Sequence, residues 1–212
     1  MKTLLGCALI CPVLLFTACK PAATFDQPQP GGTEALRAFP RGIHGQYLDA
    51  EAASVLLITD SLITRKYDFE YGEHRDSIGA SFRLSGDTLI HLKTGFHENV
   101  RVASDSIYRR AAGTDTLFQI SAHNVLKRFK GHYFLNDRYD DNRWTVQRLS
   151  LQKGVLRIGS IASEEAIKNL RELTETAADT ASTHFSPTRK QFRKFIRQDG
   201  FSDQESFQKI SS

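Results

Sequence analysis

From Gly42 onward, short apolar stretches alternate with turn residues, and one small pattern recurs: an aspartate, then a hydroxyl residue, then Leu or Ile. Asp, Ser and Thr side chains bond nearby backbone amides, so each copy predicts the exit from a turn into a strand. This spacing favours antiparallel hairpins joined in a meander. The copies are Asp60-Ser61-Leu62, Asp76-Ser77-Ile78, Asp87-Thr88-Leu89, Asp105-Ser106-Ile107 and Asp115-Thr116-Leu117.

Several of these stretches alternate apolar and charged residues with a period of two. Tyr67, Phe69 and Tyr71 flank Asp68 and Glu70. The alternation predicts strands with one apolar and one charged face, in an antiparallel sheet with a wet side. Similar alternation occurs at Phe82-Arg83-Leu84, Val100-Arg101-Val102 and Leu156-Arg157-Ile158.

A Gly-x-Tyr triplet opens a hairpin pattern twice, at Gly45-Gln46-Tyr47 and at Gly131-His132-Tyr133. An acidic loop follows in each case. The two copies are consistent with a duplicated half-sheet, with a chance match of two short motifs as the alternative.

Helical signals are confined to the end of the chain. Ser163 is a suitable N-cap, with Glu164 and Glu165 at the favourable end of the helix dipole. Ile167 and Leu170 then recur on one face. Residues 174–183, rich in Thr and Ala, indicate a loop.

A second helix is marked by Ser186 as its cap, Pro187 in its first turn and Gly200 as its left-handed end. Its apolar stripe consists of Phe192, Phe195 and Ile196, and Phe201 follows where a Schellman contact is expected. Ser202 and Glu205 match a capping box, which predicts a short last helix carrying Phe207 and Ile210.

The predicted fold class is mainly β (α+β): an antiparallel β-meander sheet or partly closed barrel with C-terminal α-helices. The division predicted along the chain is a signal peptide (1–18), a lipid-anchored flexible tether (19–41), an antiparallel β domain that admits two related halves (42–161), and a C-terminal helical segment packed on it (162–212). The tether is inferred from a stretch rich in Pro, Gly, Gln and Ala with few large apolar groups.

The amino terminus carries a targeting pattern. Lys2 precedes an apolar run from Leu4 to Phe16 that is too short to span a bilayer, and Phe16-Thr17-Ala18-Cys19 follows. This tetrapeptide resembles the lipobox of bacterial lipoproteins, with Phe16 where Leu is usual. The resemblance implies cleavage before Cys19 and acylation of that residue. The alternatives are an ordinary secretory cut after Ala18 and an uncleaved or buried amino-terminal helix.

The positions of the cysteines and the net charge limit the kinds of site that the chain can form. All 3 cysteines lie in the first 19 residues, so the processed chain would hold no disulfide, no Cys-ligated metal and no Cys nucleophile. The chain has 212 residues, 40% hydrophobic and 25% charged, which is globular composition and excludes a polytopic membrane protein. Its net charge of +4 falls by one when Lys2 is removed. Such a mild excess gives no reason to expect nucleic acid as a partner.

Catalytic and metal-binding motifs are weak. The histidines are scattered, although His91 and His97 are predicted to face each other across a turn beside Glu98. We expect no metal there, and the sequence contains no nucleophile elbow and no phosphate-binding loop, so no cofactor is predicted. Residues 136–142 form an acidic stretch, interpreted as a solvated hairpin loop with calcium binding or acid-base work as the alternative.

Two groups of side chains are candidate contact surfaces. The first is aromatic, and it would line a cleft for a ligand or else build the core: Tyr67, Phe69, Tyr71, Tyr133, Tyr139 and Trp144. The second is basic, on the outward side of the second helix, where it would face an anionic partner or only solvent: Arg189, Lys190, Arg193, Lys194 and Arg197.

The tether, the repeated Asp-hydroxyl turns and the closing stretch from Pro187 to Phe201 resemble small lipoproteins of Bacteroidetes-type bacteria. The resemblance implies the periplasmic side of a membrane, the outer one in preference to the inner, and its motifs are structural, so it assigns no activity. The predicted function is a non-enzymatic envelope module that binds a ligand or protein partner. The alternatives are an envelope hydrolase acting on glycan or peptide through carboxylates such as Asp140 and Asp141, and a structural accessory subunit of an envelope complex.

Overall fold

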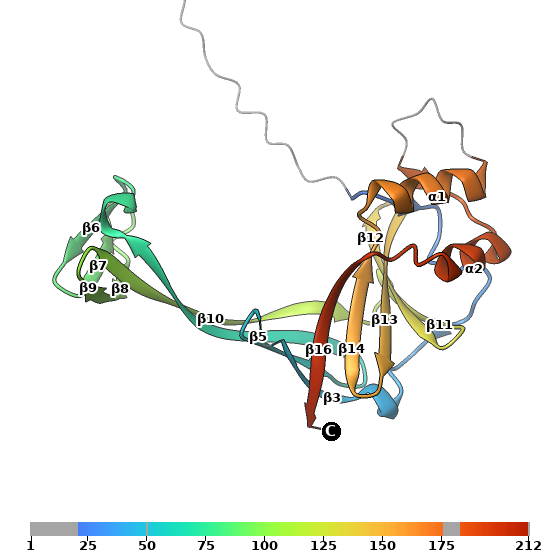
Figure 1. The fold of residues 1–212 in the computed structure, drawn as a ribbon, viewed down its shortest axis with the longest axis horizontal. Helices are drawn as coiled ribbons and strands as arrows, with labels where there is room; N and C mark the ends of the chain where they lie inside the picture. Colours follow the sequence, from blue (N-terminus) through green and yellow to red (C-terminus); the bar gives the residue numbers. More distant parts are fainter. Residues whose placement is uncertain (1–20, 50, 176–182, 212) are drawn as a thin grey trace, which may run out of the picture.

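The computed structural model describes residues 21–49, 51–175 and 183–211. It consists of a body, built on a curled antiparallel sheet, and a long two-stranded arm that ends in a small distal tip (Figure 1). The mainly β fold with antiparallel pairing and C-terminal helices is confirmed, and the sheet does not close into a barrel.

The main sheet does not follow sequence order, because β16 is inserted between β14 and β3. Along the main path, every pair of neighbours is antiparallel. The path runs through β2 (Ala35–Leu36), β11 (Asn124–Phe129), β12 (His132–Asp140), β13 (Arg143–Gln152), β14 (Val155–Ser160), β16 (Asp203–Ser211), β3 (Gly45–Asp49), β4 (Ser54–Ile58), β5 (Leu62–His74), β10 (Ser106–Gln119) and β9 (Arg101–Ala103).

Curling of the sheet creates an inner core. Side chains on alternate positions of each strand point to the same face, and those on the concave face meet one another. Tyr47 and Tyr133, from the two Gly-x-Tyr triplets, both lie in this core, and the Tyr47 hydroxyl donates to the Ile43 carbonyl over 2.8 Å. Its fully buried members include Phe39, Tyr47, Leu56, Ile63, Phe118, Leu126, Leu149, Leu156 and Phe207.

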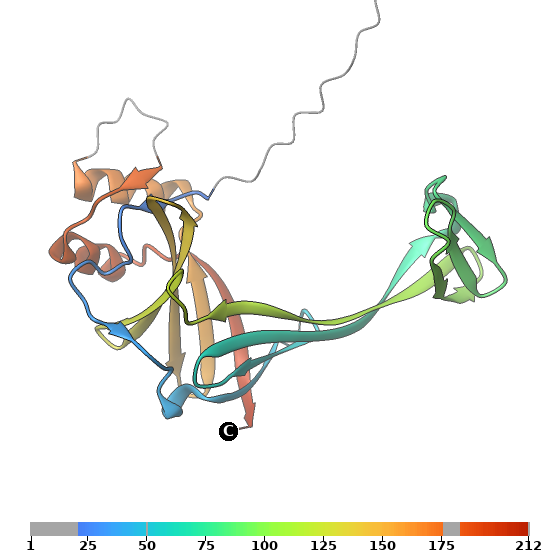
Figure 2. The ribbon, with the colours of Figure 1, turned by 180° about the vertical axis from the view of Figure 1, so that it is seen from behind.

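A second core lies between the sheet and the helices α1 (Glu164–Thr174) and α2 (Arg189–Arg197). Both helices lie on the side of the body away from the arm (Figure 2). Phe134 of β12 is fully buried, with its ring 5.4 Å from that of Phe192 and 5.9 Å from that of Phe201. Ser163 caps α1 as predicted, by accepting a bond from the Ala166 amide.

The predictions for the last part of the chain need three corrections. The N-cap of α2 is Thr188 rather than Ser186, and it forms a capping box with Gln191. The left-handed residue after the helix is Asp199 (φ 52°) rather than Gly200. Residues 203–211 form strand β16 and not a third helix. Pairing with β14 and β3 overrides the local capping signal, because it buries Phe207 in the inner core.

The prediction of a flexible tether over 19–41 is wrong for residues 21–41. They form β1 (Thr24–Phe25), which pairs with β13 and β15 (His184–Phe185), then β2 and the start of the 3-10 helix η1 (Arg41–Ile43). Two polar side chains of the body hold the segment. Lys127 Nζ donates to the carbonyls of Pro28 (2.7 Å) and Pro30 (3.0 Å). The Asn136 amide accepts from the Gln29 backbone N–H (2.6 Å) and donates to its carbonyl (2.9 Å).

The arm is the outer part of β5 and β10, which stay paired out to His74 and Ser106. Its tip has its own small core of Leu89, Val100 and Ile107. The tip contains the 3-10 helix η2 (Arg75–Ser77), strand β9 and a separate sheet of β6 (Phe82–Ser85), β7 (Thr88–His91) and β8 (His97–Asn99).

Three of the five Asp-hydroxyl copies, at Asp60, Asp87 and Asp105, lead into strands as predicted. The prediction is wrong for the other two. Asp76 lies in η2, and Asp115 lies inside β10 next to a register shift between Thr116 and Phe118. Among the described residues, no helix has both the length and the apolar character needed to cross a bilayer.

Candidate functional site

One face of the arm carries a row of aromatic side chains from β5: Tyr67, Phe69 and Tyr71. Their ring centroids are 6.1 and 6.2 Å apart. Phe69 is 40% exposed and Tyr71 39% exposed, although both follow the same alternation as the buried Ile63 nearer the body. The row therefore continues the concave face of the body sheet to a place where nothing described covers it. We call it the aromatic row.

Small residues of β10 lie opposite the row. Gly113 is paired with Tyr67 and Ala111 with Phe69. A Cβ atom at Gly113 would lie 2.6 Å from the Tyr67 hydroxyl, so the Tyr67 side chain lies directly over the backbone of β10. The small residues at these two positions of β10 leave the rings of Tyr67 and Phe69 without a large side chain opposite them.

Arg109 ends the row at the tip. Its guanidinium lies 5.8 Å from the Tyr71 ring centroid and 5.6 Å from that of Phe82, and it donates to Glu98 (2.6 Å) and to Glu73 (3.3 Å). Hydrogen bonding to Glu98 is the main cause that raises the pKa of Arg109 above its ordinary value. This charge is satisfied within the tip, so it stabilises the junction of arm and tip rather than offering a free cation.

The opposite face of the arm is ionic. Asp68 pairs with Arg110, and Glu70 pairs with Arg101. The hydrogen bonds from these arginines lower the pKa of both carboxyl groups. The Arg101 guanidinium also stacks 3.8 Å from the Tyr108 ring centroid. The two faces of one ribbon thus differ: the charges of one are paired internally, and the aromatic rings of the other are open.

The edges of the arm are also open. Strand β4 pairs with β5 only as far as Tyr67, and β9 pairs with β10 only as far as Tyr108. Among the described residues, β5 from Asp68 to His74 therefore has β10 as its one paired neighbour. Unpaired backbone N–H and C=O groups on such an edge are a template for an added strand.

The other aromatic residues of the predicted ligand surface lie elsewhere. Tyr133 is 7% exposed in the inner core, and Trp144 is 8% exposed beneath Arg138. Tyr139 is exposed, near Arg143. The six residues do not line one cleft; the structure brings together only Tyr67, Phe69 and Tyr71.

The basic residues of α2 divide into two groups. Arg189, Lys190 and Arg193 line a hollow of about 400 Å³ together with Phe129 and Lys130 from the end of β11 and the turn after it. Lys194 and Arg197 are exposed and are not among its lining residues. The sequence reading missed Phe129 and Lys130, since nothing in the helix indicates which turn packs against it. We call this hollow the basic groove.

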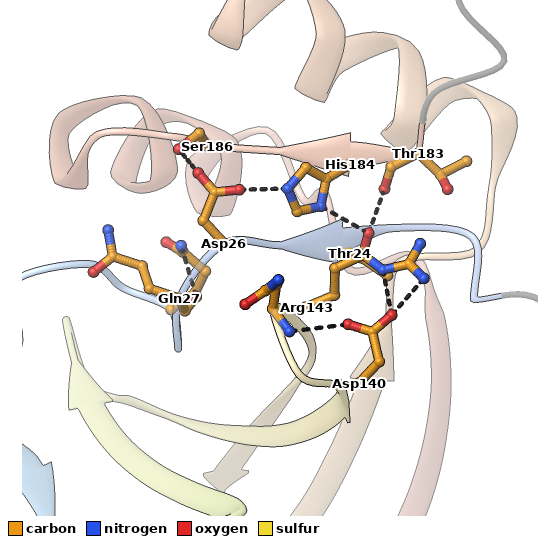
Figure 3. Close-up of polar contacts among 10 residues, drawn as sticks. Thr24, Asp26, Gln27, Asp140, Arg143, Thr183, His184 and Ser186 are labelled. Carbon is orange, nitrogen blue, oxygen red and sulfur yellow. Dashed lines mark hydrogen bonds and ion pairs between the residues drawn. The ribbon is translucent and has the colours of Figure 1, made fainter.

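A polar chain links β1 to β15 (Figure 3). Asp26 pairs with His184 and accepts from the Ser186 hydroxyl, and His184 Nδ1 lies 3.1 Å from Thr24 Oγ1. The order carboxylate, imidazole, hydroxyl is that of a nucleophilic triad. However, Thr24 is 2% exposed and its hydroxyl donates to the Thr183 carbonyl over 3.2 Å. The chain therefore fastens the amino-terminal segment instead of presenting a nucleophile.

The stretch 136–142 is not an acidic loop, which corrects the sequence reading. Its residues through Asp140 belong to β12, and only the two residues after it form the turn. Asp140 is paired with Arg143, and the hydrogen bond from Arg143 lowers the pKa of the Asp140 carboxyl group (Figure 3). Because Asp140 is held as an ion pair, the geometry does not favour the hydrolase alternative.

Asp137 is the most perturbed carboxyl group in this region. It lines a hollow of about 390 Å³ together with Thr145, Gln147 and Ser160. Burial raises its pKa to about 6. The sequence reading counted Asp137 only as one charge of a loop, because nothing local shows that a carboxylate lies on the inner face of a strand.

Of the two histidines predicted to face each other, His91 contacts a residue of its own turn. His91 Nδ1 lies 2.8 Å from Thr94 Oγ1, and Glu98 binds Arg109. No group of three potential metal ligands occurs among the described residues. Cys19 lies outside the described residues.

Comparison with protein-family models, with curated proteins and with solved structures finds no match to this chain.

Proposed function

We propose that the chain is a lipid-anchored, non-enzymatic binding protein of the cell envelope that captures an extended segment of a partner protein on its arm. The observation that carries the proposal is the aromatic row on a ribbon with open edges. A partner strand added beside β5 would pair with its free backbone groups and cover Phe69 and Tyr71 at the same time.

The energetics favour occupation of this surface. A two-stranded ribbon is marginally stable in water unless a third strand or a packed face supports it. Complete burial of an aromatic side chain contributes about 1.5 to 3 kcal/mol. Covering Phe69 and Tyr71, each about two-fifths exposed, would recover part of that for each ring. The ionic face offers no comparable gain, because its charges are already paired.

The chemistry of the partner follows from the edge. A strand added to β5 directs alternate side chains to the aromatic row and the others to the ionic face. The expected segment therefore alternates apolar residues with polar ones and brings no large net charge, since Asp68 and Glu70 are neutralised by Arg110 and Arg101.

The anchor in this proposal is Cys19. Ala23 and Thr24 are buried in the body, only four and five residues after it. An extended chain covers about 3.5 Å per residue. A lipidated Cys19 would accordingly hold the body against the membrane surface, and the arm would supply the reach that a long tether does not.

Site-specific photo-crosslinking in producing cells tests the contact. Photoreactive residues placed at Phe69 and Tyr71 should give one defined adduct, and the same group at Arg110, on the ionic face of the same ribbon, should give far less. Equal adducts from both faces, or none from the aromatic row, would contradict the proposal.

The anchor has a separate test. Intact mass and membrane fractionation of the wild-type chain and Cys19→Ala should show a lipid adduct at residue 19 and its loss in the variant. An unlipidated wild-type chain in the soluble fraction would contradict the proposed envelope location. The crosslinking experiment would still test the contact on the arm.

A further inference from the structure

We propose that the basic groove binds phosphate groups. The groove is lined by Phe129, Lys130, Arg189, Lys190 and Arg193, and lies on the α2 side of the body, away from the arm. The inference is independent of the partner contact proposed for the arm, because it uses other residues and another part of the molecule.

The groove is lined by four positively charged side chains. Lys130, Arg189, Lys190 and Arg193 form no ion pair with a described residue, and no carboxylate lines the hollow. Some arginines elsewhere in the protein do pair with acids, as Arg65 does with Glu205. Four cations gathered around one hollow repel each other, and an anion bound among them would relieve this repulsion.

The groove is also preorganised. Phe129, 9% exposed, lies 5.0 Å from the Arg189 guanidinium, measured to its ring centroid. Lys130 follows on a tight turn, where it has a φ of 51° and Gly131 one of 83°. The two elements that line the groove, α2 and the turn after β11, both belong to the body.

The helix itself is anchored. The fully buried Phe192 and Phe195 hold α2 on the sheet, so the three cations of the helix project from a rigid element. The capping box at the start of α2 occupies the backbone N–H groups of Thr188 and Gln191. The proposed recognition rests on the side-chain cations that line the groove.

Phosphate fits this arrangement better than a simple carboxylate. Guanidinium groups bind phosphate oxygens through two parallel hydrogen bonds, and ammonium groups add charge without strict geometry. Two arginines and two lysines match a ligand with several charges and many acceptor oxygens. Pyrophosphate meets both conditions, whereas acetate brings a single charge.

Titration calorimetry with pyrophosphate tests the site, on a chain that begins at Lys20 and so retains every described residue. The double variant Lys190→Gln/Arg193→Gln should weaken binding at least tenfold. The matched control Lys194→Gln/Arg197→Gln removes the same charge from the same helix outside the groove, and should change binding less than twofold. Acetate should compete poorly.

Vesicles distinguish the two sources of phosphate. If the ligand is a lipid headgroup, the chain should bind phosphatidylglycerol vesicles but not phosphatidylcholine vesicles, and pyrophosphate should displace it. If the ligand is soluble, pyrophosphate should bind while both kinds of vesicle fail. Either result supports the groove. Equal loss in the two double variants, or no saturable pyrophosphate binding at millimolar concentration, would overturn it.

Discussion

The body and the arm are built from strands with the same alternation, yet they are stabilised differently. In the body, Leu156 and Ile158 alternate with Arg157 and are covered by the curled sheet. In the arm, Phe69 and Tyr71 alternate with Glu70 and remain two-fifths exposed. Periodicity determines which side chains share a face, but whether that face is covered depends on elements distant in the sequence.

The difference predicts two levels of stability. The body has large cores on both faces of its sheet, while beyond the ribbon the arm has only the small core around Leu89. Amide exchange should report opening of the arm and tip at lower free energy than global unfolding of the body.

The largest loss of stability is expected for a substitution in the body, Phe134→Ala. This ring is fully buried among Phe192 and Phe201, and its removal leaves a cavity. We expect a loss of about 3 to 5 kcal/mol in the free energy of unfolding, measured with denaturant. The matched change Phe69→Ala in the arm should cost far less. Similar losses for the two variants would show that body and arm are one equally packed unit.

Asn136→Ala should cause the next largest loss in the free energy of unfolding. The Asn136 amide forms both bonds to the Gln29 backbone, and the site is fully buried, so the change leaves polar groups of the segment unsatisfied. A loss of about 2 to 3 kcal/mol is expected for the two bonds together. Limited proteolysis should then cut between residues 21 and 35 in the variant. A variant that keeps its amino-terminal segment protected would exclude this role.

Asp137→Asn should stabilise the protein at neutral pH. The folded-state pKa is raised to about 6 by burial, whereas the unfolded chain ionises near 3.9. Protonated Asp137 therefore favours folding below pH 4, and this advantage is lost as pH rises to about 6. The variant should gain about 2 kcal/mol at pH 7 and nothing below pH 4. Denaturant midpoints at both pH values test the sign, and an equal gain at both would assign the effect to another cause.

Gly113→Ala should have the smallest effect on stability. The new Cβ atom meets the far end of the Tyr67 side chain, which can move aside, so the expected loss is below about 1 kcal/mol. Amide exchange should rise in the arm alone. Gly72→Ala, which approaches Tyr108 on the ionic face at 3.0 Å, serves as the control and should leave the aromatic row unchanged. Faster exchange throughout the body would contradict the separation of the two regions.

Local patterns predicted much of the fold. Alternation and the Asp-hydroxyl turns indicated the antiparallel strands, and Ser163 with its acidic first turn indicated α1. Two segments were misread because their partners lie far away in the sequence. Lys127 and Asn136 give order to a Pro-rich and Gly-rich stretch, and β14 and β3 turn a capping pattern into β16.

Only some residues of each candidate surface could be grouped correctly from the sequence. Tyr67, Phe69 and Tyr71 share a strand, so the period of two placed them on one face. The sequence could not show that Tyr133 and Trp144 are buried in the body, because burial depends on the curl of the sheet. Similarly, Arg189 and its helical neighbours were recognisable as a basic face, but Phe129 and Lys130 join them only through tertiary packing.

The insertion of β16 between β14 and β3 has a consequence for a chain during synthesis. Gln208 pairs with Leu48, which lies far back in the sequence, so the two halves of the sheet stay separate until β16 is available. Until then β14 and β3 each expose an unpaired edge that can join a neighbouring chain. The period before β16 is available is therefore when the polypeptide is most exposed to aggregation.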